Sequence, residues 1–425
     1  MIRFYNCKML TLNNNFDVID NNEIWVEKDK IVYIGKEKAG NFEREINCNG
    51  NLVMPSFKNA HAHSPMTFLR SFADDLPLDR WLNESVFPME AKLNSDDCVW
   101  LTKLAIMEYL TSGITSAFDM YFLPQSIAKA CKETGFNGVI CGAVNNFVSS
   151  VDELEKDYYK YNNYCDNVSH QLGFHAEYTT DVDKLKAIAD LSNRLKAPVS
   201  THCAETEKEV NECIERYGKT PIKLFEDIGL FNYGGSLFHC NYLSDEDIEI
   251  IKKKNLFVVT NPASNCKLAS GVAPISRLID NNINVAIGTD GPASNNALDM
   301  FREMYLVTAL QKLVTKNAAA LPAEIVLKMA CSNGAKAMGI NSDCLDIGKN
   351  ADLIVLNINK PNMQPINNIV KNIVYSGSKD NIALTMVRGN ILYENGKFNI
   401  GVSEDEVYNN CQKITDKLKQ WKEDN

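Results

Sequence analysis

Hydrophobic residues in the middle of the chain form short runs that alternate with segments of helical periodicity. Segments such as 96–110 and 183–195 carry apolar residues three and four positions apart, which predicts amphipathic helices. The runs between such helices predict eight strands: Leu52–Phe57, Ile114–Met120, Phe136–Val144, Gln171–Ala176, Pro198–Glu205, Ser236–Tyr242, Leu256–Pro262 and Asn284–Gly291. Eight alternating strands and helices favour an α/β fold of the (β/α)8 TIM-barrel type. Alternation alone also fits a doubly wound sheet, so the positions of the polar residues must decide.

Both ends of the chain show a different pattern, with short strands and tight turns. Residues 23–35 hold two apolar runs around Lys28–Lys30, which predicts a hairpin. The same pattern returns after residue 350: residues 351–356, 369–376 and 384–393. Neither end has enough strands to be stable alone. We therefore predict one small composite β-sandwich domain from residues 1–51 and 350–425, with the barrel formed by residues 52–349.

Composition and charge narrow the class of protein. The chain of 425 residues is 45% hydrophobic and 23% charged, which is ordinary for a soluble globular enzyme and argues against disorder. Its net charge of −10 gives no support for a nucleic-acid or membrane partner. The N-terminus lacks a signal-peptide core, and no run is long enough to span a bilayer. Thirteen cysteines without a C-x-x-C pair indicate reduced thiols, so we expect a cytoplasmic protein.

Five of the six histidines lie at or near the C-terminal end of a predicted strand: His61, His63, His175, His202 and His239. Asp290 ends the eighth predicted strand. A single histidine in an apolar strand is usually a core residue bonded to the backbone. Five at strand ends are not explained by packing, and in a TIM barrel those ends meet on the face that carries active sites. The histidines therefore favour the barrel and predict a site at that face.

Four of these side chains form a candidate metal site: His61, His63, His202 and Asp290. His61 and His63 point the same way in an extended segment, and imidazole and carboxylate suit Zn²⁺ with a position left for water. Cys203 and Cys240 alternate to the opposite strand face, so we expect small buried hydrophobes there. Glu205 follows His202 by three residues and is a candidate for proton transfer. Its alternative role is a charge at a helix N-terminus.

Five segments together carry a resemblance to a known family: 55–63 (Pro-Ser-Phe-Lys-Asn-Ala-His-Ala-His), 201–205 (Thr-His-Cys-Ala-Glu), 237–240 (Leu-Phe-His-Cys), 261–271 (Asn-Pro-Ala-Ser-Asn-Cys-Lys-Leu-Ala-Ser-Gly) and 288–296 (Gly-Thr-Asp-Gly-Pro-Ala-Ser-Asn-Asn). Over nearly the whole chain they resemble the amidohydrolase superfamily, and within it the 5-methylthioadenosine/S-adenosylhomocysteine deaminases. The resemblance implies a hydrolase that converts the 6-amino group of an adenosine-type nucleoside to the inosine-type product and ammonia. The nucleosides in question are 5-methylthioadenosine, S-adenosylhomocysteine, adenosine and 5′-deoxyadenosine.

Three alternatives stay beside that implication. A related amidohydrolase could act on another aromatic ring, as a guanine, cytosine or triazine deaminase or chlorohydrolase, with nearly the same metal ligands. A non-catalytic metal-binding relative would be expected to have lost a ligand or the proton shuttle, and all are present. A barrel with a purely structural role is the third alternative and is less favoured still. A triad with a serine or cysteine nucleophile finds no supporting motif such as G-x-S-x-G.

The resemblance also implies a cofactor and roles for individual residues. It implies one divalent metal ion per chain, Zn²⁺ in preference to Fe, Mn or Ni, held by His61, His63, His202 and Asp290. Substrate contacts are implied for Trp81, Glu90, His175, Glu205 and Ser294. In the implied mechanism Glu205 protonates the purine ring, His239 holds the attacking water and Asp290 takes its proton. By position alone, Trp81 could be a helix core aromatic and Glu90 a first-turn helix acid. The family's habit is to form homo-oligomers.

Two features depart from the branch. Phe174 and Glu177 stand where its members usually have prolines, and residues 145–171 lack the arginine that members tend to carry near the substrate tail. A carboxylate tail is held best by an arginine fork, and Lys156 and Lys160 are poorer substitutes. We therefore expect small, uncharged 5′ groups to be turned over better than S-adenosylhomocysteine.

Overall fold

The computed structural model describes residues 1–13, 16–72, 74–76 and 80–424. Its centre is an eight-stranded sheet in the order β13-β12-β11-β10-β9-β8-β7-β6. The strands are β6 (Phe57–Ala62), β7 (Ile114–Met120), β8 (Asn137–Cys141), β9 (Val168–Gly173), β10 (Val199–Cys203), β11 (Ser236–His239), β12 (Phe257–Thr260) and β13 (Val285–Ile287). All neighbours pair in parallel, which confirms the predicted TIM barrel.

The barrel closes between β6 and the segment after β13. A parallel bridge joins Ala62 to Asp290, and the Asp290 backbone N–H donates to the carbonyl of His61 at 3.0 Å. Gly288 approaches β6 so closely that a Cβ there would lie 2.8 Å from the His61 backbone nitrogen. Only glycine fits such an approach. Closure therefore places the first and last strands, and the polar residues at their ends, side by side.

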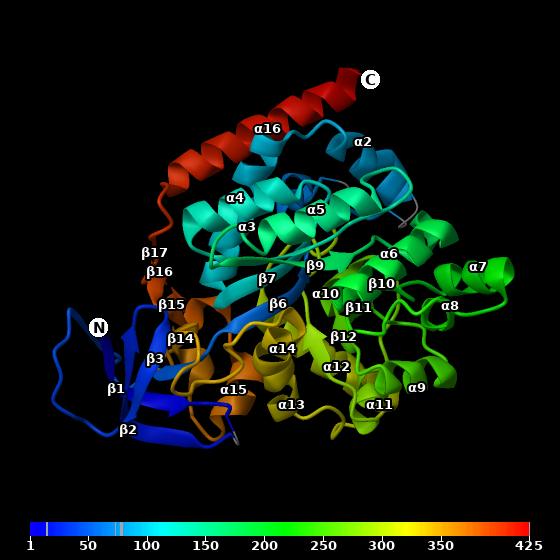
Figure 1. Cartoon of the computed structure of the whole chain (residues 1–425). Coiled ribbons are helices and arrows are strands. Elements are labelled where there is room, and N and C mark those ends of the chain that lie inside the picture. The colour runs from blue at the N-terminus through cyan, green and yellow to red at the C-terminus, as the bar shows by residue number, and fades with distance from the viewer. Residues whose placement is uncertain (14–15, 73, 77–79, 425) are drawn as a thin grey trace.

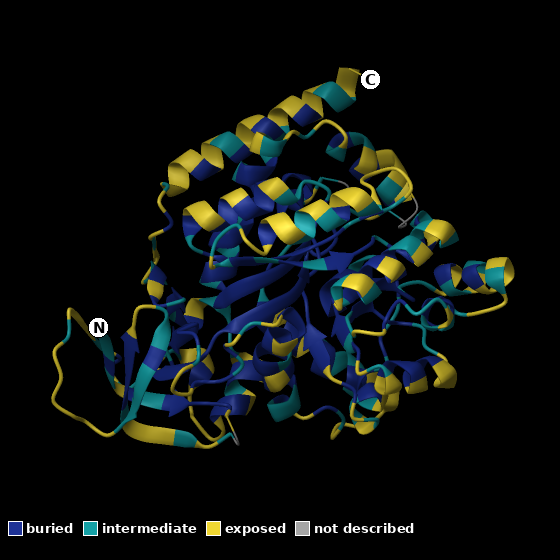
Figure 2. Cartoon of the chain, viewed as in Figure 1, coloured by how far each residue is buried: buried dark blue, intermediate teal, exposed yellow. Residues whose placement is uncertain are grey.

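Helices form the outer layer of the barrel. The longer ones are α3 (Ser95–Thr111), α4 (Pro124–Thr134), α5 (Val151–Tyr161), α6 (Val182–Leu195), α7 (Glu207–Tyr217), α9 (Asp245–Lys253) and α12 (Met300–Thr315). The shorter ones are α2 (Phe87–Glu90), α8 (Pro221–Asp227), α10 (Pro262–Lys267), α11 (Ile275–Asp280), α13 (Ala323–Lys328) and α14 (Gly334–Met338). Figure 2 shows buried strands inside and helices whose outward faces are exposed. Asn94 caps α3 by accepting a hydrogen bond from the Asp97 backbone, as the capping-box pattern predicts.

Short helical turns complete the barrel. They are the 3₁₀ turns η1 (Ser64–Leu69), η3 (Glu177–Thr179), η5 (Pro361–Met363) and η6 (Lys379–Asn381), and the π-helical turns η2 (Trp81–Val86) and η4 (Met329–Asn333). Single π-helical turns are frequent at functional sites, and η2 carries the predicted substrate residue Trp81. None of the helices in the described residues combines the length and apolar character that a membrane span needs.

Strands from both chain ends build one small domain, which confirms that the two ends combine (Figure 1). They are β1 (Ile2–Leu10), β2 (Val18–Glu27), β3 (Lys30–Gly35), β4 (Arg44–Asn47), β5 (Leu52–Pro55), β14 (Leu353–Leu356), β15 (Ile382–Val387), β16 (Asn390–Glu394) and β17 (Lys397–Phe398). Their hydrogen bonds run through one continuous mixed sheet, in which β5 joins β1 to β14. Apolar side chains of both ends, such as Phe4, Val53 and Leu353, share one core. The predicted hairpin is the β2–β3 pair.

The predicted first barrel strand, Leu52–Phe57, is wrong in its bounds. Residues 52–55 form β5 of the small domain, and the barrel strand β6 begins at Phe57. The backbone changes partners between them: Ser56 N–H donates to the Asp352 carbonyl, and Phe57 N–H donates to the Gly113 carbonyl. One apolar run therefore serves two sheets, and His61 lies inside β6.

Two helices occupy segments that we assigned to the sandwich. Residues predicted as a strand form α15 (Ile369–Ser376), capped by Asn368 and packed on α12 and α13. The C-terminal α16 (Glu404–Asp424) lies along the barrel helix α3, where the Cys411 thiol contacts the Trp100 carbonyl at 3.3 Å. The buried side of α16 repeats every three to four residues, at Val407, Cys411, Ile414 and Leu418. Both helices thus belong with the barrel's outer layer.

Candidate active site

The four predicted metal ligands converge at the C-terminal end of the barrel. His61 and His63 come from β6 and its end, His202 from β10, and Asp290 from the turn after β13. Oδ1 of Asp290 lies 3.5 Å from His61 Nε2 and 3.3 Å from His63 Nε2. The Nε2 atoms of His63 and His202 are 3.3 Å apart. The barrel therefore directs ring nitrogens and a carboxylate oxygen at one point.

Backbone carbonyls fix the orientation of two of these rings. His63 Nδ1 lies 2.6 Å from the Met120 carbonyl, and His202 Nδ1 lies 2.7 Å from the His175 carbonyl. Since a carbonyl only accepts, each Nδ1 carries a proton, which turns each Nε2 toward the site. Burial lowers the pKa of His61 to about 3 and that of His202 well below its ordinary value, so these two rings are neutral, as metal ligation requires. Burial would also lower the pKa of His63, but the adjacent Asp290 carboxylate raises it to about 9.

Ring nitrogens that lack a hydrogen-bond partner indicate whether these residues fit a metal ion. Both ring nitrogens of His61 and Nε2 of His239 are buried without a hydrogen-bond partner. Leaving a buried polar atom unpaired costs ~1–3 kcal/mol. The ligand-type atoms of His61, His63 and Asp290 lie within 4.8 Å of one another, and so do those of His61, His202 and His239. Neutral imidazoles and a carboxylate at this spacing fit a divalent cation.

Asp290 is held as an ionised carboxylate. Burial alone would raise its pKa, but the neighbouring rings of His61 and His63 hold that pKa well below its ordinary value. Its Oδ2 accepts hydrogen bonds from Ser264 Oγ at 2.5 Å and Ser294 Oγ at 3.0 Å. Ser294, which we expected to contact substrate, thus orients Asp290 and also lines the adjoining cavity.

Glu205 and His239 face each other beside the ligands. Oε2 of Glu205 lies 3.8 Å from His239 Nε2, and Ser270 Oγ donates to the other Glu205 oxygen at 2.9 Å. Nδ1 of His239 lies 2.8 Å from Asn265 Oδ1, which fixes the ring. The alternative role of Glu205, a helix N-terminal charge, is filled by others, because Thr206 caps α7. The Glu205 carboxylate is therefore available to a molecule in the cavity.

A cavity of about 510 Å³ opens above the ligands. It is lined by every predicted site residue except His61, which lies fully buried behind the others: His63, Trp81, Glu90, His175, His202, Glu205, His239, Asp290 and Ser294. Burial raises the pKa of Glu90 to about 7, and Tyr121 donates a hydrogen bond to this carboxyl at 2.7 Å. Burial lowers the pKa of His175 to about 4, so this ring is neutral. The cavity thus combines an apolar wall at Trp81 with acceptors at its inner end.

Sequence reasoning missed several residues that hold the site together: Tyr121, Glu209, Ser264, Asn265 and Ser270. The last three lie in the segment 261–271, which carried the resemblance, so a signal for them was present. Tyr121 directly follows β7. Because active-site residues of TIM barrels lie at the C-terminal ends of the strands, its position could have indicated its role. Glu209 accepts backbone hydrogen bonds from Ala204 and Glu205 at 2.9 and 2.8 Å, and nothing in its local sequence indicates that role.

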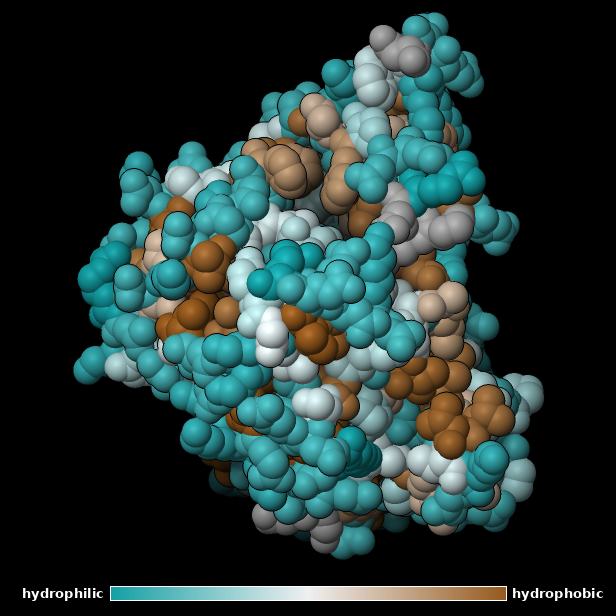
Figure 3. Space-filling model, turned by 90° about the vertical axis from the view of Figure 1, so that its right-hand side faces the viewer, coloured by the Kyte–Doolittle hydropathy of each residue, from teal (hydrophilic) through white to brown (hydrophobic). Residues whose placement is uncertain are grey.

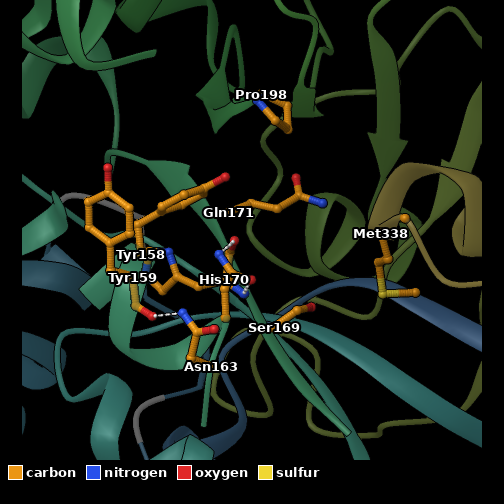
Figure 4. Close-up of a pocket in the computed structure, with 10 residues that line it drawn as sticks. Tyr158, Tyr159, Asn163, Ser169, His170, Gln171, Pro198 and Met338 are labelled. Atoms are coloured by element: carbon orange, nitrogen blue, oxygen red, sulfur yellow. Dashed lines mark hydrogen bonds between the residues drawn. The ribbon is translucent and has the colours of Figure 1, made fainter. Parts of the chain in front are cut away.

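The sixth histidine, His170, lies away from this site. It borders a second cavity of about 400 Å³ beside the N-terminal ends of β9 and β10 (Figure 4). The amides there are engaged locally, since Asn162 Nδ2 donates to the His170 carbonyl at 3.0 Å and Asn163 Nδ2 to the Tyr159 carbonyl at 2.8 Å. Among the described residues, those that line this second cavity include no charged side chain. The acids, bases and ligands thus gather at the first cavity.

The fold is a TIM barrel, and histidines and an aspartate gather at the C-terminal ends of its strands. These two features define the class of protein, a TIM-barrel protein whose candidate active site can hold a metal ion. The chain belongs to the Amidohydrolase family, whose model matches residues 52–392. It is 36% identical to the 5-methylthioadenosine/S-adenosylhomocysteine deaminase of Thermoanaerobacter pseudethanolicus, over 95% of this chain and 96% of that protein. It is also 36% identical to the 5′-deoxyadenosine deaminase of Methanococcoides burtonii, over 96% of each.

A solved structure of a deaminase shares the fold of this chain. The adenosine deaminase from Xanthomonas campestris with bound Zn superposes with a TM-score of 0.95 at 28% identity. The match covers 99% of this chain and 98% of that one. The likeness therefore includes both the barrel and the small domain.

Proposed function

We propose that the protein is a metal-dependent hydrolytic deaminase that converts the 6-amino group of adenosine-type nucleosides to the inosine-type product and ammonia. The observation that carries this proposal is the placement of Glu205, His239 and Asp290 in one cavity with Trp81 and Glu90. The first three offer proton-transfer groups, and the last two offer a ring surface and an acceptor for hydroxyls. The relatives named as 5-methylthioadenosine/S-adenosylhomocysteine and 5′-deoxyadenosine deaminases support the substrate class.

The proposed ligands of one divalent cation are His61, His63, His202 and Asp290. The unpartnered ring nitrogens of His61, the neutral rings of His61 and His202, and the Zn named with the adenosine deaminase relative support Zn²⁺, with Fe, Mn and Ni as alternatives. When bound, such a cation supplies a Lewis acid that makes water ionise near neutral pH.

Three residues around the proposed metal site each take part in the reaction. Asp290, ionised and fixed by Ser264 and Ser294, accepts a proton from the attacking water. The unpartnered Nε2 of His239 holds that water beside the amino-bearing carbon. Glu205 gives a proton to the neighbouring purine nitrogen, so that negative charge does not accumulate as the water attacks. Asp290 then passes its proton to the departing amine, which leaves as ammonia, and the remaining hydroxyl proton of the adduct restores the Glu205 carboxylic acid.

The other side chains place the nucleoside. Trp81 presents an apolar surface to the base, and the Glu90 carboxylate can accept hydrogen bonds from both ribose hydroxyls. Neutral His175, whose Nδ1 is 2.9 Å from Thr179 Oγ1, presents its other ring nitrogen as a further partner.

An ammonia-release screen tests the proposal. The metal-loaded protein is incubated with adenosine, 5′-deoxyadenosine, 5-methylthioadenosine, S-adenosylhomocysteine, guanine and cytosine, and the chelator-treated protein serves as the control. We expect ammonia from the adenosine-type nucleosides only. Release from guanine or cytosine without release from any adenosine would assign the site to a different ring.

A further inference from the structure

The outer part of the active-site cavity carries exposed aromatic rings. Phe87, Phe147 and Tyr178 line this cavity although 44%, 86% and 42% of their surfaces are exposed. They come from three separate segments: α2, the connection after β8, and η3. Single exposed hydrophobic residues are ordinary, but three at one cavity mark a surface that an apolar group covers. Figure 3 shows one face of the molecule, which is mostly hydrophilic and carries hydrophobic side chains in separate small clusters.

The described residues that line the cavity include no lysine or arginine. The carboxyl groups among them are those of Glu90, Glu205 and Asp290. Two cations on neighbouring segments already have partners. Lys184 Nζ donates to the Asn145 carbonyl at 2.7 Å, and Arg216 pairs with Glu177 at 2.5 Å. A carboxylate on a bound molecule would therefore find no bidentate arginine among the described lining residues.

The direction of the substrate follows from the inner residues. On the proposed function, the base lies against Glu205 and His239 and the ribose against Glu90, so the 5′ carbon points toward the outer part of the cavity. A 5′ substituent would then contact Phe147 and Val148, which belong to the same connection after β8. The chemistry of these two side chains decides which 5′ substituents are accepted.

We propose that Phe87, Phe147, Val148 and Tyr178 form a subsite for an apolar 5′ substituent. Its substrates are adenosines that carry 5′-methylthio or longer 5′-alkylthio groups, and it disfavours the charged amino-acid tail of S-adenosylhomocysteine. This inference rests on the proposed function and names its substrate class more narrowly. It assigns specificity to the rim of the cavity, apart from the residues that perform the chemistry.

The test compares kcat/KM for 5′-deoxyadenosine, 5-methylthioadenosine, 5′-butylthioadenosine and S-adenosylhomocysteine in the metal-loaded protein. Each buried methylene of the alkylthio series should raise kcat/KM by about 3- to 4-fold. S-adenosylhomocysteine should be ~10- to 100-fold poorer than the methylthio compound, since its tail finds no charged partner. Phe147→Ala should lower the ratio of kcat/KM for butylthio- over 5′-deoxyadenosine by about 5-fold. Tyr408→Ala, at an exposed aromatic on α16, should leave the ratio unchanged.

Several results would overturn the subsite. One is S-adenosylhomocysteine turned over as well as 5-methylthioadenosine; another is a Phe147→Ala variant that leaves the ratio unchanged. If Lys184→Met lowered turnover of S-adenosylhomocysteine alone, a tail-binding cation would lie at the rim, which contradicts the proposal. Deamination of all four nucleosides without preference would refute the subsite but keep the proposed function. Absence of ammonia from every nucleoside would refute both.

Discussion

Nε2 of His239 lies 3.8 Å from Oε2 of Glu205 and is buried without another partner. The separation is too long for a hydrogen bond. The two residues come from adjacent parallel strand ends, because Cys203 pairs with His239 in the β10–β11 register and Glu205 follows two residues later. Both side chains are anchored on their far side, by Ser270 and Asn265. The gap between them therefore suits an atom of a bound molecule that both can reach.

Replacing Glu205 tests whether it transfers a proton. Glu205→Gln keeps the size and the hydrogen bond from Ser270 but cannot deliver the proton. We expect kcat for adenosine-type nucleosides to fall by ~10²–10⁴-fold, with metal content unchanged by elemental analysis. Glu207→Gln, two residues on and exposed in the first turn of α7, is the matched control and should retain activity. A Glu205→Gln variant within a few-fold of wild type would reduce the residue to a surface charge.

We predict that each chain binds one divalent metal ion. Elemental analysis of the protein after removal of loosely bound ions should give about one equivalent, and chelation should abolish deamination. Loss of the ion should also lower the melting temperature, since a ligand that binds only the folded state stabilises it. His202→Ala should lose both the ion and its contribution to the melting temperature. Two equivalents needed for full activity would contradict a single site.

The metal-ligand geometry was the part of the site that sequence could predict best. His202 and Asp290 lie at or just after the ends of recognisable strands, and parallel strands of a barrel end on one face. His61 lies near the end of β6, a strand that was predicted with the wrong bounds. Histidine is scarce in this chain, so its positions stand out against the apolar background. The residues that orient the ligands are serines and asparagines, which occur everywhere in loops. Ser264 and Asn265 could be found only through the family motif.

Contacts between residues far apart in the chain determine two features of the fold that could not be predicted from the sequence. The apolar run 52–57 looks uniform, and its division between two sheets depends on Ser56 meeting Asp352, far along the chain. Residues 369–376 are rich in β-branched side chains and suggest a strand, yet α15 forms because one face, including Ile373 and Val374, packs on α12 and α13. Tertiary packing overrides local propensity in both places.

Buried Glu303 should make stability depend on pH. Burial raises the pKa of Glu303 to about 8, although Ala263 N–H and Asn295 Nδ2 both donate to it. Between pH ~5 and ~8 the folded protein keeps a proton that the unfolded chain releases, so stability falls as pH rises through this window. Glu303→Gln should flatten the pH dependence by up to ~1.4 kcal/mol per pH unit.

Urea unfolding of the metal-loaded protein at pH 5, 6, 7 and 8 measures this effect. Glu406→Gln, at an exposed position on α16, is the control and should keep the wild-type slope. Equal slopes in wild type and Glu303→Gln would show that Glu303 stays ionised in the folded protein throughout.

The Glu90 carboxyl should set the acid side of the pH profile. Burial raises its pKa to about 7, and the hydrogen bond from Tyr121 lowers it. Only the ionised carboxylate accepts both ribose hydroxyls, so kcat/KM should rise with pH around 7. Tyr121→Phe removes a hydrogen bond to a charged group, worth ~1.5–3 kcal/mol, and should move this rise up by ~1–2 pH units. At pH 6.5 the variant should lose ~10-fold or more in kcat/KM and recover most of it near pH 9. 2′,3′-Dideoxyadenosine lacks the hydroxyls, so its profile should be the same in both proteins; a shift with that substrate too would mean that Tyr121 acts on the chemistry and not through Glu90.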